Sequence, residues 1–138
     1  MGCNKVPEPT SPVAQSKPKK ADLELQEQCA KQAREEFKQA GWDKDSNFTN
    51  HYNEKLNRCF MLIEKTDAKL DPGTIWRTKI LADAYEGRTI GLFSWHTEKG
   101  KKYWEVPPFQ CEMMPPSGEK AICKSEAEFD EFVKTYME

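Results

Sequence analysis

The 138-residue sequence contains no apolar run that approaches the roughly 20 residues of a membrane-spanning helix. It has only two histidines and no CxxC pair, which excludes the ligand spacing of a structural zinc site. It also has no G-x-S-x-G turn, the motif that presents the nucleophilic serine of many hydrolases. The sequence therefore predicts neither a zinc-stabilised domain nor a hydrolase of that type, and it predicts no cofactor.

Positive charge is scarce where a nucleic-acid binder would need it. The chain has a formal net charge of -2, of which residues 1–20 contribute +3, which leaves -5 for the remainder. An acidic domain without a basic stripe is a poor match for a phosphate backbone, so we expect no nucleic-acid partner. Aromatic residues, in contrast, are plentiful, with four Trp, four Tyr and seven Phe, and this composition is typical of an ordered globular domain.

The first 20 residues differ in composition from the rest of the chain. They contain four prolines among polar residues and lysines: Pro7, Pro9, Pro12 and Pro18. Proline removes a backbone donor and fixes φ, so neither a helix nor a sheet can persist in this segment. We therefore expect residues 1–20 to be a disordered linker that reaches about 50 Å at about 3.1 Å per residue. Residues 21–138 are expected to form a single domain.

Gly2 and Cys3 resemble the end of a bacterial lipobox, in which a small residue precedes the cysteine that becomes acylated. The resemblance implies that Cys3 is the lipid-attachment residue of an envelope lipoprotein whose signal peptide is removed. Asn4 after the cysteine favours an outer-membrane lipoprotein that faces the periplasm or the cell surface. One alternative is myristate on Gly2 with palmitate on Cys3, but that pattern requires Ser or Thr where this chain has Val6. The other is an ordinary N-terminus with an incidental cysteine.

The other four cysteines are predicted to form two disulfides, as expected of cysteines in an oxidising envelope. Four cysteines allow three pairings. The segment FQCEMMPPSGEKAIC is typical of a hairpin, and folding it about Ser117 places Cys111 directly opposite Cys123. Cys29 is then left to pair with Cys59. The alternative is four reduced cysteines in a cytosolic protein.

Two segments have the apolar periodicity of helices. Apolar residues recur every four positions from Leu25 to Phe37, and Gly41 is a natural stop for this helix. Near the C-terminus, Ser125 and Glu128 form a capping box ahead of a second amphipathic segment.

Between these helices the sequence is β-like. Glu86-Gly87 is a good two-residue hairpin turn, and the β-like segments are residues 58–65, 74–85, 88–97, 101–106 and 109–123. The order of elements predicts an α+β fold, with an antiparallel β-meander sheet flanked by an N-terminal and a C-terminal helix. Both helices are expected on the same face of the sheet.

The stretch DKDSNFTNHYNE carries oxygen-bearing side chains at positions 1, 3, 5 and 12 of an EF-hand loop. These residues are Asp43, Asp45, Asn47 and Glu54. Position 6 of such a loop must be Gly, and here it is Phe48. A calcium-binding module is therefore a minor alternative, and the stretch is interpreted as a polar loop between helix and strand.

The histidines and a set of four aromatic residues give two further hypotheses. His51 has the chemistry of a general base, but no nucleophile accompanies it, and His51 and His96 are both interpreted as structural residues. A small envelope enzyme with His51 in its site is the alternative to a binding module. Four aromatic residues are candidates for a groove that binds a peptide or a glycan, although aromatics on strands more commonly form core contacts: Trp76, Trp95, Tyr103 and Trp104.

Three segments, NHYNEKLNRCF, LADAYEG and WEVPPFQC, are similar to segments of a family of small, uncharacterised bacterial proteins that often carry a lipoprotein leader. The similarity covers approximately residues 25–137. It implies a shared fold and shared cysteine positions, and it implies no activity or catalytic residue. We therefore expect a lipid-anchored envelope domain that binds the membrane through its lipid and presents its fold to an envelope protein or a small ligand.

Overall fold

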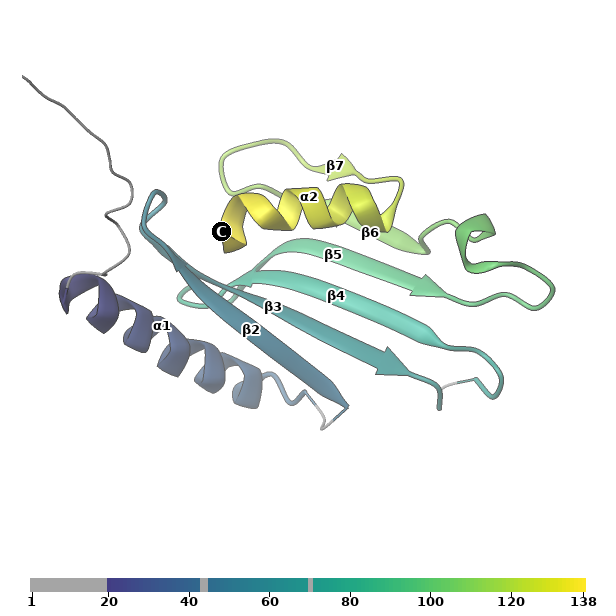
Figure 1. The fold of residues 1–138 in the computed structure, drawn as a ribbon, viewed down its shortest axis with the longest axis horizontal. Coiled ribbons are helices and arrows are strands. Elements are labelled where there is room, and N and C mark those ends of the chain that lie inside the picture. Colours follow the sequence, from purple (N-terminus) through teal and green to yellow (C-terminus); the bar gives the residue numbers. More distant parts are fainter. Residues whose placement is uncertain (1–19, 43–44, 70) are drawn as a thin grey trace, which may run out of the picture.

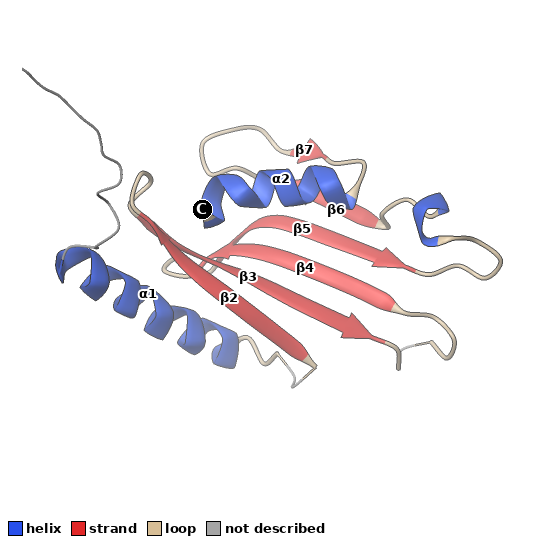
Figure 2. Cartoon of the chain, in the orientation of Figure 1, coloured by secondary structure: helices blue, strands red, loops and turns tan. Residues whose placement is uncertain are grey.

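The computed structural model describes residues 20–42, 45–69 and 71–138; Cys3 and Asp43 are among the residues outside this described part. Two helices enclose a run of strands that are consecutive in the sequence (Figures 1 and 2). The elements in chain order are α1 (Lys20–Gln39), β2 (Ser46–Asn53), β3 (Arg58–Asp67), β4 (Trp76–Asp83), β5 (Arg88–His96), the 3-10 helix η2 (Tyr103–Glu105), β6 (Gln110–Met113), β7 (Ala121–Ile122) and α2 (Glu126–Met137).

The strands form one six-stranded sheet in the order β2-β3-β4-β5-β6-β7, and every neighbouring pair is antiparallel. Each strand therefore pairs with the next strand along the chain, which confirms the predicted β-meander and the α+β class. A register shift between β4 and β5 leaves Ile90 as an extra residue on β5. Such a bulge increases the local twist of the strands.

The two helices cover opposite faces of the sheet, so the expectation that both lie on one face is wrong. Alternate residues of β3 belong to different apolar clusters: Cys59 and Met61 pack with α1, whereas Phe60 packs with α2. Side chains on a strand alternate between the two faces, so β3 is buried on both sides. Figure 1 shows α2 in front of the strands and α1 beside and behind β2.

Helix α1 docks through a stripe of small residues. Cys29 and Ala33 are fully buried, and Leu25 and Phe37 flank them at the predicted four-residue spacing. The helix ends at Gln39, and Gly41 has a φ of 75°, a left-handed conformation that glycine adopts without steric cost. The predicted helix and its stop are both confirmed.

Both predicted disulfides are present. Cys29 on α1 is joined to Cys59 on β3, and Cys111 is joined to Cys123 with a Cα–Cα distance of 5.0 Å. The register of β6 and β7 pairs Glu112 with Ile122, which is the alignment expected for a hairpin folded about Ser117. The described part of the chain therefore uses all of its cysteines in disulfides.

Ser125 caps helix α2 as predicted, although the Glu128 side chain bonds to the amide before the cap rather than to that of Ser125. The Ser125 side chain accepts a hydrogen bond from the Glu128 amide at 3.1 Å, while the Glu128 carboxylate accepts one from the Lys124 amide at 2.8 Å. The apolar face of α2 packs through Phe129, Val133 and Tyr136 onto the sheet.

The stretch 46–53 forms strand β2, so its interpretation as a loop is wrong. Extended backbone over eight residues places Asp45 and Glu54 beyond opposite ends of the strand, roughly 25–30 Å apart at about 3.3 Å per residue. The EF-hand geometry requires these side chains around one ion, and a strand cannot supply that ring. In the part of the chain that the structure describes, no group of three or more His, Cys, Asp or Glu side chains could hold a metal ion.

Two other local predictions are also wrong. The turn between β4 and β5 has four residues, 84–87, because the carboxylate of Asp83 accepts hydrogen bonds from the amides of Tyr85 and Glu86. Residues 103–105 form η2 rather than a strand. The amide of Glu105 bonds to the Lys102 carbonyl, and the two prolines that follow remove the donors that a strand would need.

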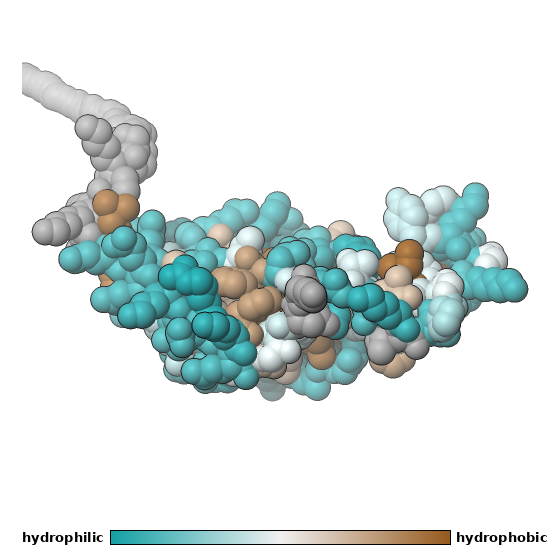
Figure 3. Space-filling model, turned by 90° about the horizontal axis from the view of Figure 1, so that it is seen from below, coloured by the Kyte–Doolittle hydropathy of each residue, from teal (hydrophilic) through white to brown (hydrophobic). Residues whose placement is uncertain are grey.

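The surface seen from below Figure 1 is mostly hydrophilic, and apolar residues form only small patches on it (Figure 3). Neither α1 nor α2, the helices of the described chain, combines the length with the apolar character that crossing a membrane requires.

Candidate functional site

A groove of about 620 Å³ lies between η2 with the segment after it and the start of α2. Its volume is within the usual range for ligand sites in proteins. Aromatic rings and prolines line one side of the groove, and the first residues of α2 line the other. The lining residues are Arg77, Phe93, Trp95, Tyr103, Trp104, Glu105, Val106, Pro107, Pro108, Lys124, Ser125, Glu126 and Ala127.

The inner part of the groove is formed by β5. Phe93 and Trp95 are two residues apart on this strand, so both side chains point to the face that α2 covers. The indole nitrogen of Trp95 donates a hydrogen bond to the carbonyl of Val106 at 2.9 Å, which ties the segment after η2 to the sheet. The position of this wall is therefore set by a partly buried hydrogen bond.

Tyr103 and Trp104 form the outer wall, and both are among the most exposed of the large hydrophobic residues in the described chain. Their side chains are 71% and 65% exposed, far above the values for the core residues. The two rings meet edge to face, with centroids 5.0 Å apart and an interplanar angle of 88°. Lys102 places its ammonium 5.2 Å from the Trp104 ring centroid, a cation–π contact.

The wall opposite the aromatic rings is ionic. Arg77 donates to both carboxylate oxygens of Glu126, at 3.0 and 2.5 Å, and Lys79 bridges Glu126 and Asp130 at 2.9 Å each. Partial burial alone would raise the pKa of Glu126, but hydrogen bonds from Arg77 and Lys79 outweigh burial and lower it. The hydrogen bond to Glu126 likewise raises the pKa of Arg77. The network fixes the start of α2 against β4.

Of the four aromatic residues predicted to line a groove, the structure brings three together. Trp95, Tyr103 and Trp104 line the groove, but Trp76 lies on the opposite face of the sheet. There its ring packs against His96 at 4.4 Å and Phe109 at 5.4 Å. The fourth aromatic is therefore part of a separate cluster.

The two histidines are not brought together. His51 lies on the edge strand β2 opposite Phe60, and His96 ends β5, where its Nδ1 lies 3.0 Å from the Thr97 carbonyl oxygen. His96 is in contact with Trp76 and with a backbone carbonyl, which matches the structural interpretation of this residue.

Sequence reasoning missed the ionic wall. Arg77 and Lys79 are two residues apart on β4, which is the signal that they share a face, and the capping residue Ser125 placed Glu126 in the first turn of α2. That these elements face one another depends on how α2 lies across the sheet.

Comparisons of the chain with protein-family models, with curated proteins and with solved structures find no match.

Proposed function

We propose that this protein is a lipid-anchored domain of the bacterial cell envelope that binds an extended peptide segment of an envelope partner in its aromatic groove. The exposure of Tyr103 and Trp104 beside a groove of about 620 Å³ is the observation that carries the proposal. Large aromatic side chains exposed together at a concave site are typical of recognition surfaces, because they offer contact area at low entropic cost.

The arrangement of the rings favours a peptide over a glycan. A polysaccharide chain stacks best on rings that share a plane, whereas Tyr103 and Trp104 are nearly perpendicular. Perpendicular rings bound separate recesses, which suit the successive side chains of an extended peptide. The ionic wall opposite, with Arg77 and Glu126, offers donors and acceptors for the backbone of such a segment.

Two observations support the lipid anchor. The first is the Gly2-Cys3 pair with its lipobox-like character. The second is that the other four cysteines pair with one another, which is typical of oxidising compartments and leaves Cys3 as the single cysteine without a disulfide partner in the domain. Several acyl chains, at about 0.8 kcal/mol per buried CH₂, would hold the protein at a membrane.

Placement of a photo-crosslinking amino acid at position 104 tests the groove. The protein is expressed with a lipoprotein leader in bacteria, and the matched control carries the same amino acid at Tyr85, which is exposed but lies outside the groove. We expect a discrete protein adduct from position 104, identified by mass spectrometry, that is lost on adding the Trp95→Ala substitution. Equal adducts from both positions would contradict a groove-specific partner.

The anchor has an independent test. Intact mass of the same leader-bearing protein is expected to exceed the polypeptide mass by the acyl groups, and Cys3→Ser is expected to abolish the increase and release the protein from the membrane fraction. A membrane-bound Cys3→Ser variant would contradict anchoring through Cys3.

A further inference from the structure

A second pocket, of about 470 Å³, opens at the other end of β5. The aromatic groove lies near Trp95 at the end of this strand, whereas the second pocket lies near Arg88 at its start. The turns β2–β3 and β4–β5, the loop after β6 and the last turn of α2 meet there (Figure 1). No sequence motif pointed to this pocket, because it is assembled from four separate segments.

The pocket is lined by a buried tyrosine whose hydroxyl has no hydrogen-bond partner among the described residues. Tyr136 is only 7% exposed, and its ring is held by edge-to-face contacts with Phe60 and Phe132, each with centroids 5.1 Å apart. Its hydroxyl makes no hydrogen bond with any other described residue. Burial raises the pKa of Tyr136, which keeps the hydroxyl protonated and able to donate. A buried hydroxyl in this state is stabilised by a ligand that accepts its hydrogen bond.

Two arginines line the same pocket and share one exposed carboxylate. Arg58 Nη1 lies 2.9 Å from Glu86 Oε2, and Arg88 Nη2 lies 3.4 Å from Glu86 Oε1. Arg58 Nη1 also donates to the buried carboxylate of Asp83. These contacts leave Arg58 Nη2 and Nε for other acceptors, and Glu86, about half exposed, is free to turn toward solvent.

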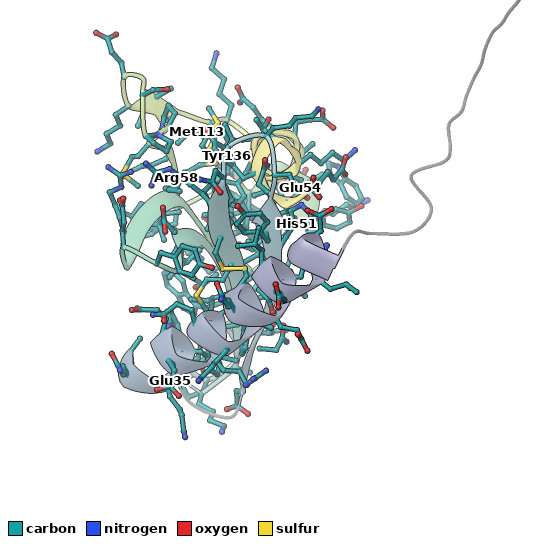
Figure 4. All side chains as sticks on the ribbon, turned by 90° about the vertical axis from the view of Figure 1, so that its left-hand side faces the viewer. Glu35, His51, Glu54, Arg58, Met113 and Tyr136 are labelled. Carbon is teal, nitrogen blue, oxygen red and sulfur yellow. A yellow bond between two sulfur atoms is a disulfide. The ribbon has the colours of Figure 1, made fainter. Side chains whose placement is uncertain are left out.

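The view in Figure 4 looks at this end of the molecule. Arg58 and Tyr136, which line the pocket, and Met113 of β6 are in the upper part of this view, and Glu35, from the later part of α1, is at the bottom. The Ser117 hydroxyl also lines the pocket, and Leu56 and Phe60 supply an apolar side. Donors from separate elements thus converge beside an apolar surface.

We propose that this pocket binds an amphiphilic phosphate ester, with Arg58, Arg88 and Tyr136 on the phosphate oxygens and Leu56 and Phe60 on the adjoining apolar part. Guanidinium groups bind phosphate and carboxylate through paired hydrogen bonds. Three donor groups on three elements match the three non-bridging oxygens of a phosphate monoester better than the two oxygens of a carboxylate.

Two sources of this ligand are consistent with the position of the pocket. The first residue of α1, Lys20, lies at the same end of the molecule as the last turn of α2 (Figure 1), so the chain that precedes α1 joins the domain at this end. The ligand is then a membrane lipid with a phosphate monoester headgroup, such as phosphatidic acid, a source that rests on the proposed lipid anchor. The other source is a soluble phosphate ester, which requires no anchor.

Calorimetric titration of the unacylated, disulfide-bonded full chain with hexyl phosphate tests the pocket. We expect Arg88→Gln to weaken binding about tenfold and Tyr136→Phe several-fold, since a hydrogen bond to a charged group is lost in each. Glu86→Gln is expected to tighten binding, because it removes the competing carboxylate. Arg58 is left unchanged, because its loss would strand the buried charge of Asp83.

Tyr85→Phe is the matched control, since Tyr85 lies on the neighbouring turn outside the pocket. Its affinity and melting temperature are expected to be unchanged. Tyr136→Phe is expected to keep the full melting temperature while losing affinity, which separates a ligand contact from a structural hydroxyl. Absence of hexyl phosphate binding, or equal affinity in wild type, Arg88→Gln and Tyr136→Phe, would overturn the proposal.

Vesicle sedimentation distinguishes the two sources. Vesicles of phosphatidic acid and phosphatidylcholine are compared with vesicles of phosphatidylcholine alone, using wild type and Arg88→Gln. Binding to the acidic vesicles that depends on Arg88 identifies a membrane lipid, whereas binding of hexyl phosphate without vesicle binding identifies a soluble ester. The protein in both assays is unacylated, so a missing acyl group on Cys3 would overturn the anchor and leave this result standing.

Discussion

The two faces of the sheet hold their helices by different means. On the face covered by α2, the buried residues are mostly large, and Phe60, Phe93 and Phe129 are the largest of those that are fully buried. On the face covered by α1, the helix contributes the small residues Cys29 and Ala33 to the buried cluster. One helix is therefore docked by extensive apolar burial, and the other by a shallow contact with a covalent bond.

This difference predicts where stability resides. Burial of a large apolar side chain contributes roughly 1.5–3 kcal/mol, so α2 gains several such contributions. A stripe of small residues gives α1 much less, and the Cys29–Cys59 bond compensates by restricting the unfolded chain. Reduction should accordingly affect α1 more than α2.

The largest effect is expected for Phe129→Ala. Phe129 is fully buried on α2, and its ring packs against Phe93 with centroids 5.8 Å apart, so the substitution leaves a cavity and should cost about 3–5 kcal/mol of unfolding free energy. Phe37→Ala is the matched change on α1, where the ring is only partly buried, and it should cost clearly less. Urea denaturation measures the unfolding free energy of both variants. Equal losses in the two variants would contradict the proposed difference between the two faces of the sheet.

Removal of the Cys29–Cys59 disulfide by Cys29→Ala with Cys59→Ala should cost about 3.5 kcal/mol, from the entropy of a loop with a sequence separation of 30. Hydrogen exchange should show that amides of α1 lose protection before those of α2. The matched control is removal of Cys111–Cys123, with a separation of 12, for which about 3 kcal/mol is expected. Uniform loss of protection in both helices would contradict separate docking.

How far the sequence predicts this fold depends on the range of the interactions. The Cys111–Cys123 pair, the Ser125 cap of α2 and the hairpin about Ser117 follow from local spacing, and Cys29–Cys59 then follows by elimination; all are confirmed. The placement of the helices on opposite faces was missed, although the unbroken apolar run from Cys59 to Ile63 is a signal of burial on both sides.

Edge and loop segments were harder to predict for physical reasons. β2 is an edge strand with a mostly polar sequence, so its alternation is carried by only Phe48 and Tyr52. The aromatic groove was foreseen in part, because Tyr103 and Trp104 are adjacent in sequence. The ionic wall and the pocket around Tyr136 depend on elements that converge only in three dimensions.

A smaller effect is expected for Gly91→Ala, which tests how closely α2 approaches the sheet. A Cβ at position 91 would lie 3.0 Å from Phe129 Cε1 and 3.2 Å from Phe132 Cε2, so these rings must shift. We expect a loss of about 1–3 kcal/mol in urea denaturation. Gly118→Ala is the control: its Cβ would lie 3.1 Å from Pro115 Cγ, but this contact is on the exposed β6–β7 loop rather than under α2, so stability should change by less. An unaffected Gly91→Ala variant would show that the α2 layer is looser than its packing indicates.

The smallest effect concerns pH and the ionic wall. Hydrogen bonds from Arg77 and Lys79 lower the pKa of Glu126 below its ordinary value of 4.5, in spite of the partial burial that opposes them. A carboxylate with a lowered pKa in the folded state contributes stability that is present above pH 4.5 and is lost as the pH falls through the folded-state pKa. Because the pair is partly exposed, we expect this contribution to be about 0.5–1 kcal/mol of unfolding free energy.

Glu126→Gln should remove this contribution at pH 7 and make the loss of stability at acid pH shallower. Glu131→Gln is the control and should do neither, because Glu131 lies on the solvent side of α2 with its side chain 74% exposed. Identical pH profiles for the Glu126→Gln variant and wild type would show that this wall positions α2 without stabilising it.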